Sequence, residues 1–303
     1  MKLRTCQRRG VLAAPLLLLG AAAARAEREE WRDAARGRTV PVRLRFPLTR
    51  VGAPVVIVSH GLGGSRDGLA YLGAALAEAG FVAVHLQHAG SDSAMLRGPA
   101  GAFLGMAGAV LDVRNALDRL GDVAFALDTL AERMDIRSCA IAGHSFGAWT
   151  VTHMLGERLP LGTSGLTLPD PRLRAGIALS PIPPVLIPPA SAFEHMLTPM
   201  LHVTGTRDRG LIEAVRPEER TIPYRDSHGP AVLAVLAGAN HAAFAGEEGA
   251  GRYWNDPTYQ GRTSQLAVRF LQAVLLGDGA ARARLLRGAG LAQGDRIESR
   301  KME

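Results

Sequence analysis

The pentapeptide Gly-His-Ser-Phe-Gly at residues 143–147 constrains the fold of this chain more than any other feature. The residues before it, 138–142, are small and apolar and predict a buried strand, and residues 148–155 can continue as a helix. Gly-x-Ser-x-Gly between a strand and a helix is typical of a strained elbow that presents the serine hydroxyl above a sheet. We expect Gly143 and Gly147 to be glycines because the strand and the helix nearly touch there. A plain glycine-rich turn is the alternative, since the chain contains 35 glycines.

Buried strands and amphipathic helices alternate along most of the chain. Period-two alternation predicts a strand at residues 39–46, and apolar runs predict strands at 54–59, 81–86, 138–142, 175–179, 200–204 and 231–237. Helical spacing predicts helices at 67–79, 110–134 and 265–276. This alternation is typical of the α/β class, with a mostly parallel central sheet and helices on both faces. Residues 39–276 show neither a repeat nor a linker, which favours one domain.

The two ends of the chain differ from this central region. Residues 1–26 combine a basic head, an apolar run and the sequence Ala24-Arg25-Ala26, which predict a cleavable export signal. The pair Arg8-Arg9 suggests the twin-arginine route. An uncleaved membrane anchor is the alternative, but the apolar run is shorter than the ~20 residues that a span needs. We therefore predict a periplasmic or secreted protein with no stable membrane span, one α/β domain at 27–277 and a polar, basic tail at 278–303.

The net charge of +7 comes largely from the predicted signal. Residues 1–26 contain five basic side chains and no acidic one, so the remainder carries only +2. With no basic patch, the composition speaks against nucleic-acid binding. Loss of Cys6 with the signal leaves Cys139 without a disulfide partner in the chain.

Three residues are candidates for nucleophilic catalysis. A serine hydroxyl needs a base to take its proton, and that base needs a carboxylate to orient it. Ser145 stands at the centre of the pentapeptide, Asp208 follows the strand predicted at 200–204, and His241 follows the strand predicted at 231–237. Because the carboxyl ends of parallel strands meet at one edge of a sheet, we expect the three to lie together. A turn-capping aspartate and a structural histidine are the plainer alternatives for Asp208 and His241.

Two backbone N–H groups are candidates to hold the negative charge that develops on a substrate carbonyl oxygen. One belongs to Phe146, directly after the serine. The other belongs to Leu62, in the glycine-rich segment at residues 60–64 that follows the strand predicted at 54–59. The residues expected to support the elbow and this loop are Gly143, His144, Gly147, His60 and Gly61. A simple glycine turn is the alternative for the loop.

Other polar and apolar residues are weaker candidates. Glu213 and Asp226 do not closely follow a predicted strand, and His144 is expected to face away from the serine hydroxyl. His88 follows the strand at 81–86, which leaves a place in the site open to it. The proline-rich segment 181–199 is equally compatible with a pocket wall and with an ordinary surface loop. The candidate residues for an apolar pocket are Phe103, Met106, Pro184, Val185, Leu186 and Ile187.

Four segments together resemble the α/β-hydrolase superfamily over about residues 39–276: 58–64, 143–147, 201–208 and 238–244. They are more closely similar to bacterial dienelactone-hydrolase-like proteins and platelet-activating-factor acetylhydrolases. True dienelactone hydrolases use a cysteine where this chain has Ser145, which counts against dienelactone itself as the substrate. The resemblance implies an α/β-hydrolase fold and a carboxylic-ester hydrolase that needs no metal or organic cofactor.

The expected function is an exported serine esterase that acts on a small-molecule ester through an acyl-enzyme intermediate. The apolar pocket candidates favour an acyl or aryl ester. A polyester depolymerase, a lipase, a thioesterase or an acyltransferase that uses the same three residues is the nearest alternative. A non-catalytic binding protein of the same fold is a more distant one, because related proteins without activity typically lose the serine or the histidine.

Overall fold

A computed structural model describes residues 26–97, 112–163, 165–210, 214–247 and 255–302. The predicted export signal therefore lies outside the described residues, apart from Ala26. Within the described residues no helix combines the length and the apolar character that crossing a membrane requires. Cys139 is a free, buried cysteine.

In the described part of the chain, a nine-stranded sheet forms the centre of the molecule, in the order β1-β2-β4-β3-β5-β6-β7-β8-β9. The neighbouring strands from β4 to β8 are parallel, whereas β1, β2 and β9 extend the two ends of the sheet by antiparallel pairing. The strands are β1 (Ala26–Asp33), β2 (Arg38–Arg45), β3 (Val55–Ser59), β4 (Val82–Leu86), β5 (Cys139–His144), β6 (Leu173–Leu179), β7 (Met200–Arg207), β8 (Ala231–Asn240) and β9 (Arg296–Arg300). The carboxyl ends of these parallel strands lie at the same edge of the sheet, as the sequence predicts.

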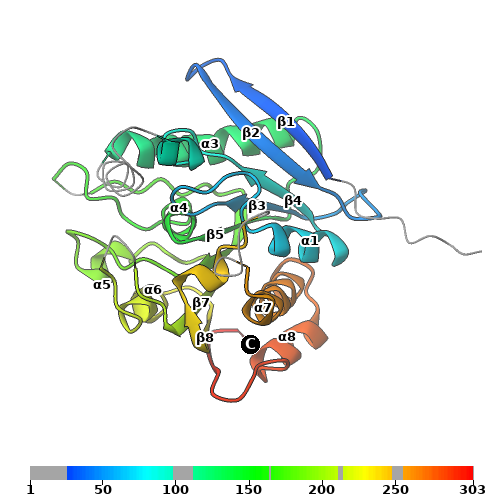
Figure 1. The fold of residues 1–303 in the computed structure, drawn as a ribbon, viewed down its shortest axis with the longest axis vertical. Coiled ribbons are helices and arrows are strands. Elements are labelled where there is room, and N and C mark those ends of the chain that lie inside the picture. The colour runs from blue at the N-terminus through cyan, green and yellow to red at the C-terminus, as the bar shows by residue number, and fades with distance from the viewer. Residues whose placement is uncertain (1–25, 98–111, 164, 211–213, 248–254, 303) are drawn as a thin grey trace, which may run out of the picture.

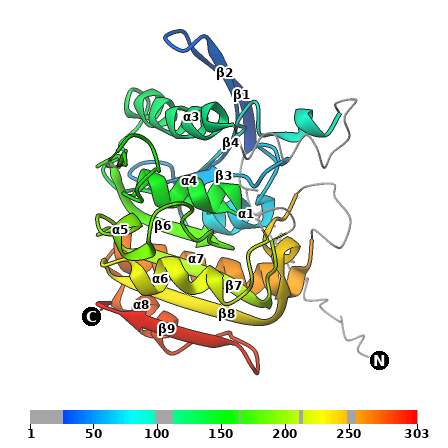
Figure 2. The ribbon, with the colours of Figure 1, turned by 90° about the vertical axis from the view of Figure 1, so that its left-hand side faces the viewer.

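Helices cover both faces of the sheet (Figure 1). One face carries α1 (Ala70–Glu78), α7 (Pro257–Leu275) and α8 (Gly279–Leu286), and the other, which faces the viewer in Figure 2, carries α3 (Val113–Ala131), α4 (Phe146–Met154), α5 (Pro189–Ala192) and α6 (Ile222–Asp226). Three short 3₁₀ segments, η1 (Ser93–Arg97), η2 (Glu219–Thr221) and η3 (His241–Phe244), complete the described elements.

The central strands are apolar throughout because each of their faces packs against a helical layer. In β3, Val55 and Ile57 pack on the α3 and α4 side, and Val56 and Val58 pack on the α1 and α7 side. Burial on both faces fixes the register of these strands, since a slip of one residue would exchange the two sets of side chains. The register in turn fixes which residues stand at the carboxyl edge, where the candidate site lies.

The segment 278–303, which the sequence analysis treated as a polar tail, differs from that expectation. Asp278 accepts hydrogen bonds from the backbone of Ala280 and Ala281 and so caps α8, and β9 pairs with β8. Leu285 and Met302 are buried against the α7 side of the core. Because most residues of the segment are polar, its composition does not indicate these few apolar contacts. The strand β9 forms because the edge of β8 can pair with one more strand.

Candidate active site

Ser145 lies in the sharp turn between β5 and α4. Its backbone has φ 56° and ψ −116°, a conformation that a residue with a side chain seldom adopts. The N–H of Ser145 donates to the carbonyl of Leu179 in the neighbouring strand β6, at 2.9 Å. The turn is therefore tied into the sheet while the serine side chain stands at its carboxyl edge.

The glycines on either side of Ser145 are required by close contacts. A Cβ atom on Gly143 would lie 2.3 Å from the carbonyl oxygen of Gly147, and one on Gly147 would lie 2.0 Å from the carbonyl oxygen of Ser59. Both distances are far below van der Waals contact with backbone atoms. The expected close approach of strand and helix is confirmed.

The structure brings Ser145, His241 and Asp208 together from three segments of the chain. His241 Nε2 lies 3.0 Å from Ser145 Oγ, and His241 Nδ1 lies 2.8 Å from Asp208 Oδ1. A carboxylate can only accept, so we assign the proton to Nδ1 and leave Nε2 free to accept from the serine hydroxyl. Ser145 and His241 are 9% and 7% exposed, and Asp208 is fully buried.

The local sequence explains why His241 lies at this edge. Strand β8 ends at Asn240, whose side-chain oxygen accepts from the N–H of Ala243 at 3.0 Å. This cap turns the chain into η3, with His241 as its first residue. The histidine predicted to follow the strand therefore starts a short helical turn that directs its ring to Ser145.

Asp208 is held as a carboxylate by its surroundings. Thr204 Oγ1 donates to Asp208 Oδ2 at 2.8 Å, and Arg220 Nε lies 3.1 Å from Asp208 Oδ1. Burial alone would raise the pKa of Asp208, but the hydrogen bond from His241 and the positive charge of Arg220 outweigh it and lower the pKa to about 2. Asp208 is therefore ionised at neutral pH.

Arg220 is a site residue that the sequence analysis missed. It is fully buried, and its guanidinium donates to the carbonyl oxygens of Asp208, Ser180 and Pro181, the last two at the end of β6. Its Nη2 also lies 3.2 Å from His241 Nδ1. The surrounding run of charged residues at 216–220 resembles a solvated surface, and only tertiary contact distinguishes Arg220 from its neighbours.

His144 supports the candidate base. Its Nε2 lies 3.0 Å from the carbonyl oxygen of His241, and the two imidazole rings lie 4.8 Å apart between centroids. Burial, followed by the nearby charge of His241, lowers the pKa of His144 to about 3, so its ring is neutral and donates through Nε2. His144 therefore contacts the backbone of His241, whereas the side chain of His241 contacts Ser145.

The loop after β3 lies directly against the elbow. A Cβ atom on Gly61 would lie 3.1 Å from His144 Nδ1 and 3.6 Å from Ser145 Cβ, so this loop approaches the serine closely. Gly63 N–H donates to Ser91 O at 2.9 Å, which ties the loop to the end of β4. Leu62 lies between these two anchored glycines. Across the elbow, Phe146 is the first residue of α4, where backbone N–H groups have no partner within the helix.

A second serine–histidine–aspartate array lies beneath this loop. Ser59 Oγ is 3.0 Å from His88 Nε2, and His88 Nδ1 is 3.1 Å from Asp122 Oδ2. All three residues are fully buried. Burial, together with the positive charge of Arg119, lowers the pKa of His88 to about 4, which keeps its ring neutral. His88, whose place in the site was left open by the sequence, therefore belongs to this internal network.

His60 connects the internal network to the loop. Its Nε2 accepts from His88 N–H at 3.0 Å, and its Nδ1 lies 2.6 Å from the carbonyl oxygen of Gly61. Because Nε2 accepts, Nδ1 carries the proton and donates to Gly61. His60 thus supports the backbone of the loop, as the sequence analysis expected.

Comparison with known proteins places the chain in a family. A family described as serine aminopeptidase, S33, matches residues 53–228, which is more than half of the chain. The chain belongs to this S33 family. The matched region contains Ser145 and Asp208 and ends before His241. Among curated protein sequences, none matches this chain significantly.

A solved structure shows the same fold. Ferulic acid esterase from Streptomyces cinnamoneus is similar with a TM-score of 0.63 at 20% sequence identity, over 88% of this chain and 93% of that chain. Together with the parallel sheet and its two helical layers, this likeness shows an α/β-hydrolase fold. The finer resemblance to dienelactone-hydrolase-like proteins and platelet-activating-factor acetylhydrolases stays a prediction.

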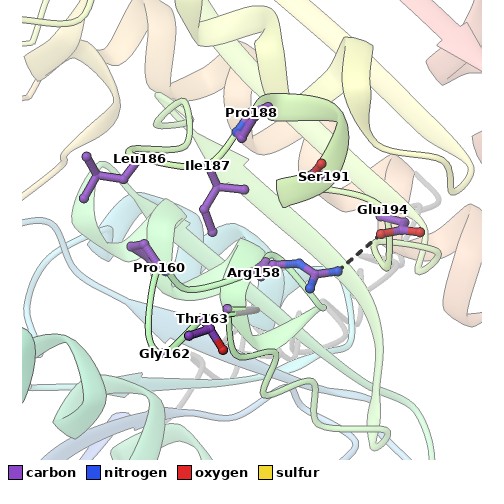
Figure 3. Close-up of a pocket in the computed structure, with 10 residues that line it drawn as sticks. Arg158, Pro160, Gly162, Thr163, Leu186, Ile187, Pro188, Ser191 and Glu194 are labelled. Atoms are coloured by element: carbon purple, nitrogen blue, oxygen red, sulfur yellow. Dashed lines mark hydrogen bonds and ion pairs between the residues drawn. The ribbon is translucent and has the colours of Figure 1, made fainter.

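The described residues place part of the expected apolar pocket away from the candidate site. Leu186 and Ile187 line an open cavity of about 580 Å³ beside Arg158 and Glu194, and no lining residue belongs to the candidate site (Figure 3). Val185 and Leu186 are exposed, and Phe103, Met106 and the rival acid Glu213 lie outside the described residues. Prolines keep the segment 181–199 irregular except for the single turn α5.

Proposed function

We propose that this S33-family protein is a serine hydrolase that cleaves carboxylic esters. The observation that carries the proposal is the contact of His241 with Ser145 at 3.0 Å on one ring nitrogen and with Asp208 at 2.8 Å on the other. This is the geometry that nucleophilic catalysis by a serine requires. The similar solved structure is named as a ferulic acid esterase, which supports an ester, and an ester of an aromatic carboxylic acid in particular, as the substrate class.

The proposed reaction begins with attack of Ser145 Oγ on the ester carbonyl carbon while His241 Nε2 takes the hydroxyl proton. The carbon–oxygen bond to the alcohol then breaks, and His241 returns the proton to the leaving alcohol. A water molecule next gives its proton to His241 and attacks the acyl-enzyme, which releases the carboxylic acid and restores Ser145. Asp208 stabilises the imidazolium that exists between these steps, since it is ionised and fixed by Thr204 and Arg220.

In this mechanism, the N–H groups of Leu62 and Phe146 hold the oxyanion of the tetrahedral intermediate. The close approach of Gly61 to Ser145 supports the role of the loop, and the position of Phe146 at the start of α4 supports the role of its amide. Gly143 and Gly147 make this geometry accessible, because a side chain on Gly143 would push β5 and α4 apart, and one on Gly147 would push α4 away from the end of β3.

The substrate is proposed to be a small-molecule ester. Hydrolysis of p-nitrophenyl acetate, butyrate and octanoate by the purified protein and by Ser145→Ala tests this directly. We expect turnover that is lost in the variant and a chain-length profile that reports the size of the acyl site. Parallel assays with a thioester, a long-chain lipid, an insoluble polyester and an aminoacyl p-nitroanilide compare the other reactions that the same three residues perform. Turnover that persists in Ser145→Ala would contradict the proposal, and the absence of all turnover would favour a binding protein.

We also propose that the protein is exported and that cleavage follows Ala26. Strand β1 begins at Ala26, so this cleavage would leave all but one residue of the strand. Expression of the full chain in a bacterial host, followed by fractionation and N-terminal sequencing, is expected to find a product beginning at Glu27 outside the cytoplasm. An uncleaved product in the cytoplasm or the membrane would contradict this proposal without affecting the enzymatic one.

A further inference from the structure

Arg119 joins two elements that flank the proposed oxyanion site. It lies within α3, far from the pentapeptide in sequence, and its side chain is fully buried. The guanidinium Nε donates to Thr150 Oγ1 at 2.9 Å, and Nη2 donates to Ser59 Oγ at 2.9 Å and to the carbonyl oxygen of His60. Nη1 donates to Ser91 Oγ at 2.9 Å.

These contacts reach the backbone beside both candidate oxyanion donors. His60 O belongs to the peptide that leads into Gly61 and Leu62. On the other side, Thr150 Oγ1 donates to Phe146 O at 3.0 Å, and the Arg119 guanidinium carbon lies 4.5 Å from the centroid of the Phe146 ring. A single rigid side chain therefore contacts the loop that carries Leu62 and the helix turn that carries Phe146.

The chemistry of the contacts requires an arginine. The planar guanidinium presents its donors in a fixed fork, whereas a lysine ammonium is one compact charge on a flexible stem. Burial opposes the charged form of Arg119, and the carboxylate of Asp122 favours it. Asp122 also accepts from His88 Nδ1, so that His88 Nε2 accepts from the hydroxyl of Ser59. Because the hydroxyl proton of Ser59 points to His88, the lone pairs of its oxygen are available to accept from Arg119. The internal Ser59–His88–Asp122 array thus positions an acceptor for the guanidinium.

We propose that Arg119 is a positioning residue that fixes the separation of the Leu62 and Phe146 N–H groups. The inference rests on the proposed esterase function and deepens it, because it assigns the precision of the oxyanion site to a side chain that does not touch substrate. Preorganised donors act only when they are placed to within a fraction of an ångström, and a misplacement of ~1 Å can cost about 100-fold in rate.

The test compares Arg119→Met and Arg119→Lys with the unaltered protein. Three quantities are measured: kcat and KM for p-nitrophenyl butyrate, the inhibition constant of a trifluoromethyl ketone, and the fraction of sites that a fluorophosphonate labels at completion. The ketone carbon forms a bond to Ser145 Oγ, the serine proton passes to His241, and the resulting oxyanion occupies the proposed site. For Arg119→Met we expect kcat to fall by about 100-fold and ketone affinity to fall in parallel, with KM changed by less than about threefold. The kcat and the ketone affinity of Arg119→Lys are expected to lie between those of the unaltered protein and those of Arg119→Met.

Labelling at completion separates misfolding from misplacement. A merely structural role would lower the labelled fraction and leave the ketone affinity of the remaining sites unchanged, which would overturn the proposal. So would unchanged kcat in folded Arg119→Met. Lack of turnover and labelling in the unaltered protein would instead refute the proposed function itself.

A milder pair of variants decides the matter if Arg119→Met does not fold. Thr150→Val removes the acceptor of Arg119 Nε, and Thr152→Val alters a buried threonine two residues further along α4 whose hydroxyl donates to the backbone of α4. We expect kcat and ketone affinity to fall together by about 3- to 10-fold in Thr150→Val and to stay unchanged in Thr152→Val. Equal effects of the two substitutions would overturn the proposal.

Discussion

Two serine–histidine–aspartate arrays with almost the same distances lie within the described residues. In the candidate site, Ser145 Oγ to His241 Nε2 is 3.0 Å and His241 Nδ1 to Asp208 is 2.8 Å, and in the internal array, which consists of Ser59, His88 and Asp122, the matching distances are 3.0 Å and 3.1 Å. Residue types and spacing therefore do not distinguish a nucleophile from a structural network.

Access and backbone conformation distinguish the two arrays. Ser145 and His241 retain some exposure, and Ser145 stands on a turn with positive φ. Ser59 is the last residue of the regular strand β3, is fully buried, and accepts a hydrogen bond from Arg119. A substrate carbonyl can approach only the first serine, and only that serine lies beside the first N–H of a helix.

The arginines that bind the two aspartates connect different elements of the fold. Both carboxyls have a pKa of about 2, because hydrogen bonds from a histidine and contact with arginine outweigh burial, which acts in the opposite direction. Asp122 binds Arg36 and Arg38, and so connects α3 to the beginning of β2. Asp208 binds Arg220, which connects the ends of β6 and β7. The internal array therefore holds the scaffold, and the other holds the candidate base.

The largest expected difference between the arrays is in the two serines. Ser145→Ala removes the nucleophile and should lower kcat by about 10⁴-fold or more. Ser59→Ala should keep turnover within about tenfold of that of the unaltered protein. It should lower the free energy of unfolding by about 1–3 kcal/mol, because a donor of Arg119 and the acceptor nitrogen of His88 lose their buried hydrogen-bond partner. Steady-state kinetics with urea unfolding measures both. Comparable losses of kcat in the two variants would contradict the assignment of Ser145 as the nucleophile and of Ser59 as a structural residue.

The two aspartates are expected to separate in the same way. Asp208→Asn should lower kcat by up to about 10⁴-fold, since the amide favours the wrong imidazole tautomer while the fold is kept. Asp122→Asn leaves Arg36 and Arg38 beside a neutral amide and should lower the free energy of unfolding by about 3–5 kcal/mol. Turnover per labelled site should change little in Asp122→Asn. If that turnover fell as far as in Asp208→Asn, the internal array would have a chemical role.

A smaller effect is expected at the arginine of the candidate site. Arg220→Lys keeps the charge but loses the fork that binds Asp208 and the end of β6, so kcat should fall by about tenfold. Arg216→Gln is the matched control, because Arg216 lies in the same charged run, is exposed and pairs with Glu219. A fall in kcat of the same size in both variants would remove Arg220 from the account.

The smallest expected effect concerns stability in acid. The folded pKa of Asp122 is lowered to about 2 from its ordinary value of 3.8, so its contribution is present above about pH 4 and is lost as the pH falls towards 2. The loss is about 2 kcal/mol. Urea unfolding between pH 2 and 6 should show this slope in the unaltered protein and a shallower one in Asp122→Asn. Equal slopes would mean that Asp122 is not held as a carboxylate by its partners.

The sequence was sufficient for the parts of the site that depend on local structure. Gly143, Ser145 and Gly147 form a pattern that is recognisable between a predicted strand and a predicted helix, and Asp208 and His241 directly follow apolar strands, so the sheet brings them together. The glycine-rich loop could be found for the same reason. The family match and the similar solved structure agree with the predicted fold.

The parts that escaped prediction depend on contacts between distant segments. Arg119 and Arg220 are charged residues on elements with exposed faces, and nothing local indicates their burial. The internal array left a weak signal, because Ser59 and His88 are polar residues at or just beyond the ends of adjacent apolar strands. The strand β9 escaped because its pairing depends on the open edge of β8 rather than on its own composition.

The most direct test of the account is the position of a covalent label. The purified protein is treated with a fluorophosphonate, digested and mapped by mass spectrometry, with Ser145→Ala treated in parallel. The account predicts one phosphonylated residue, Ser145, and no label in the variant, with Ser59 unmodified in both. A label on another serine, or equal labelling of Ser145→Ala, would contradict the assignment of Ser145 as the nucleophile.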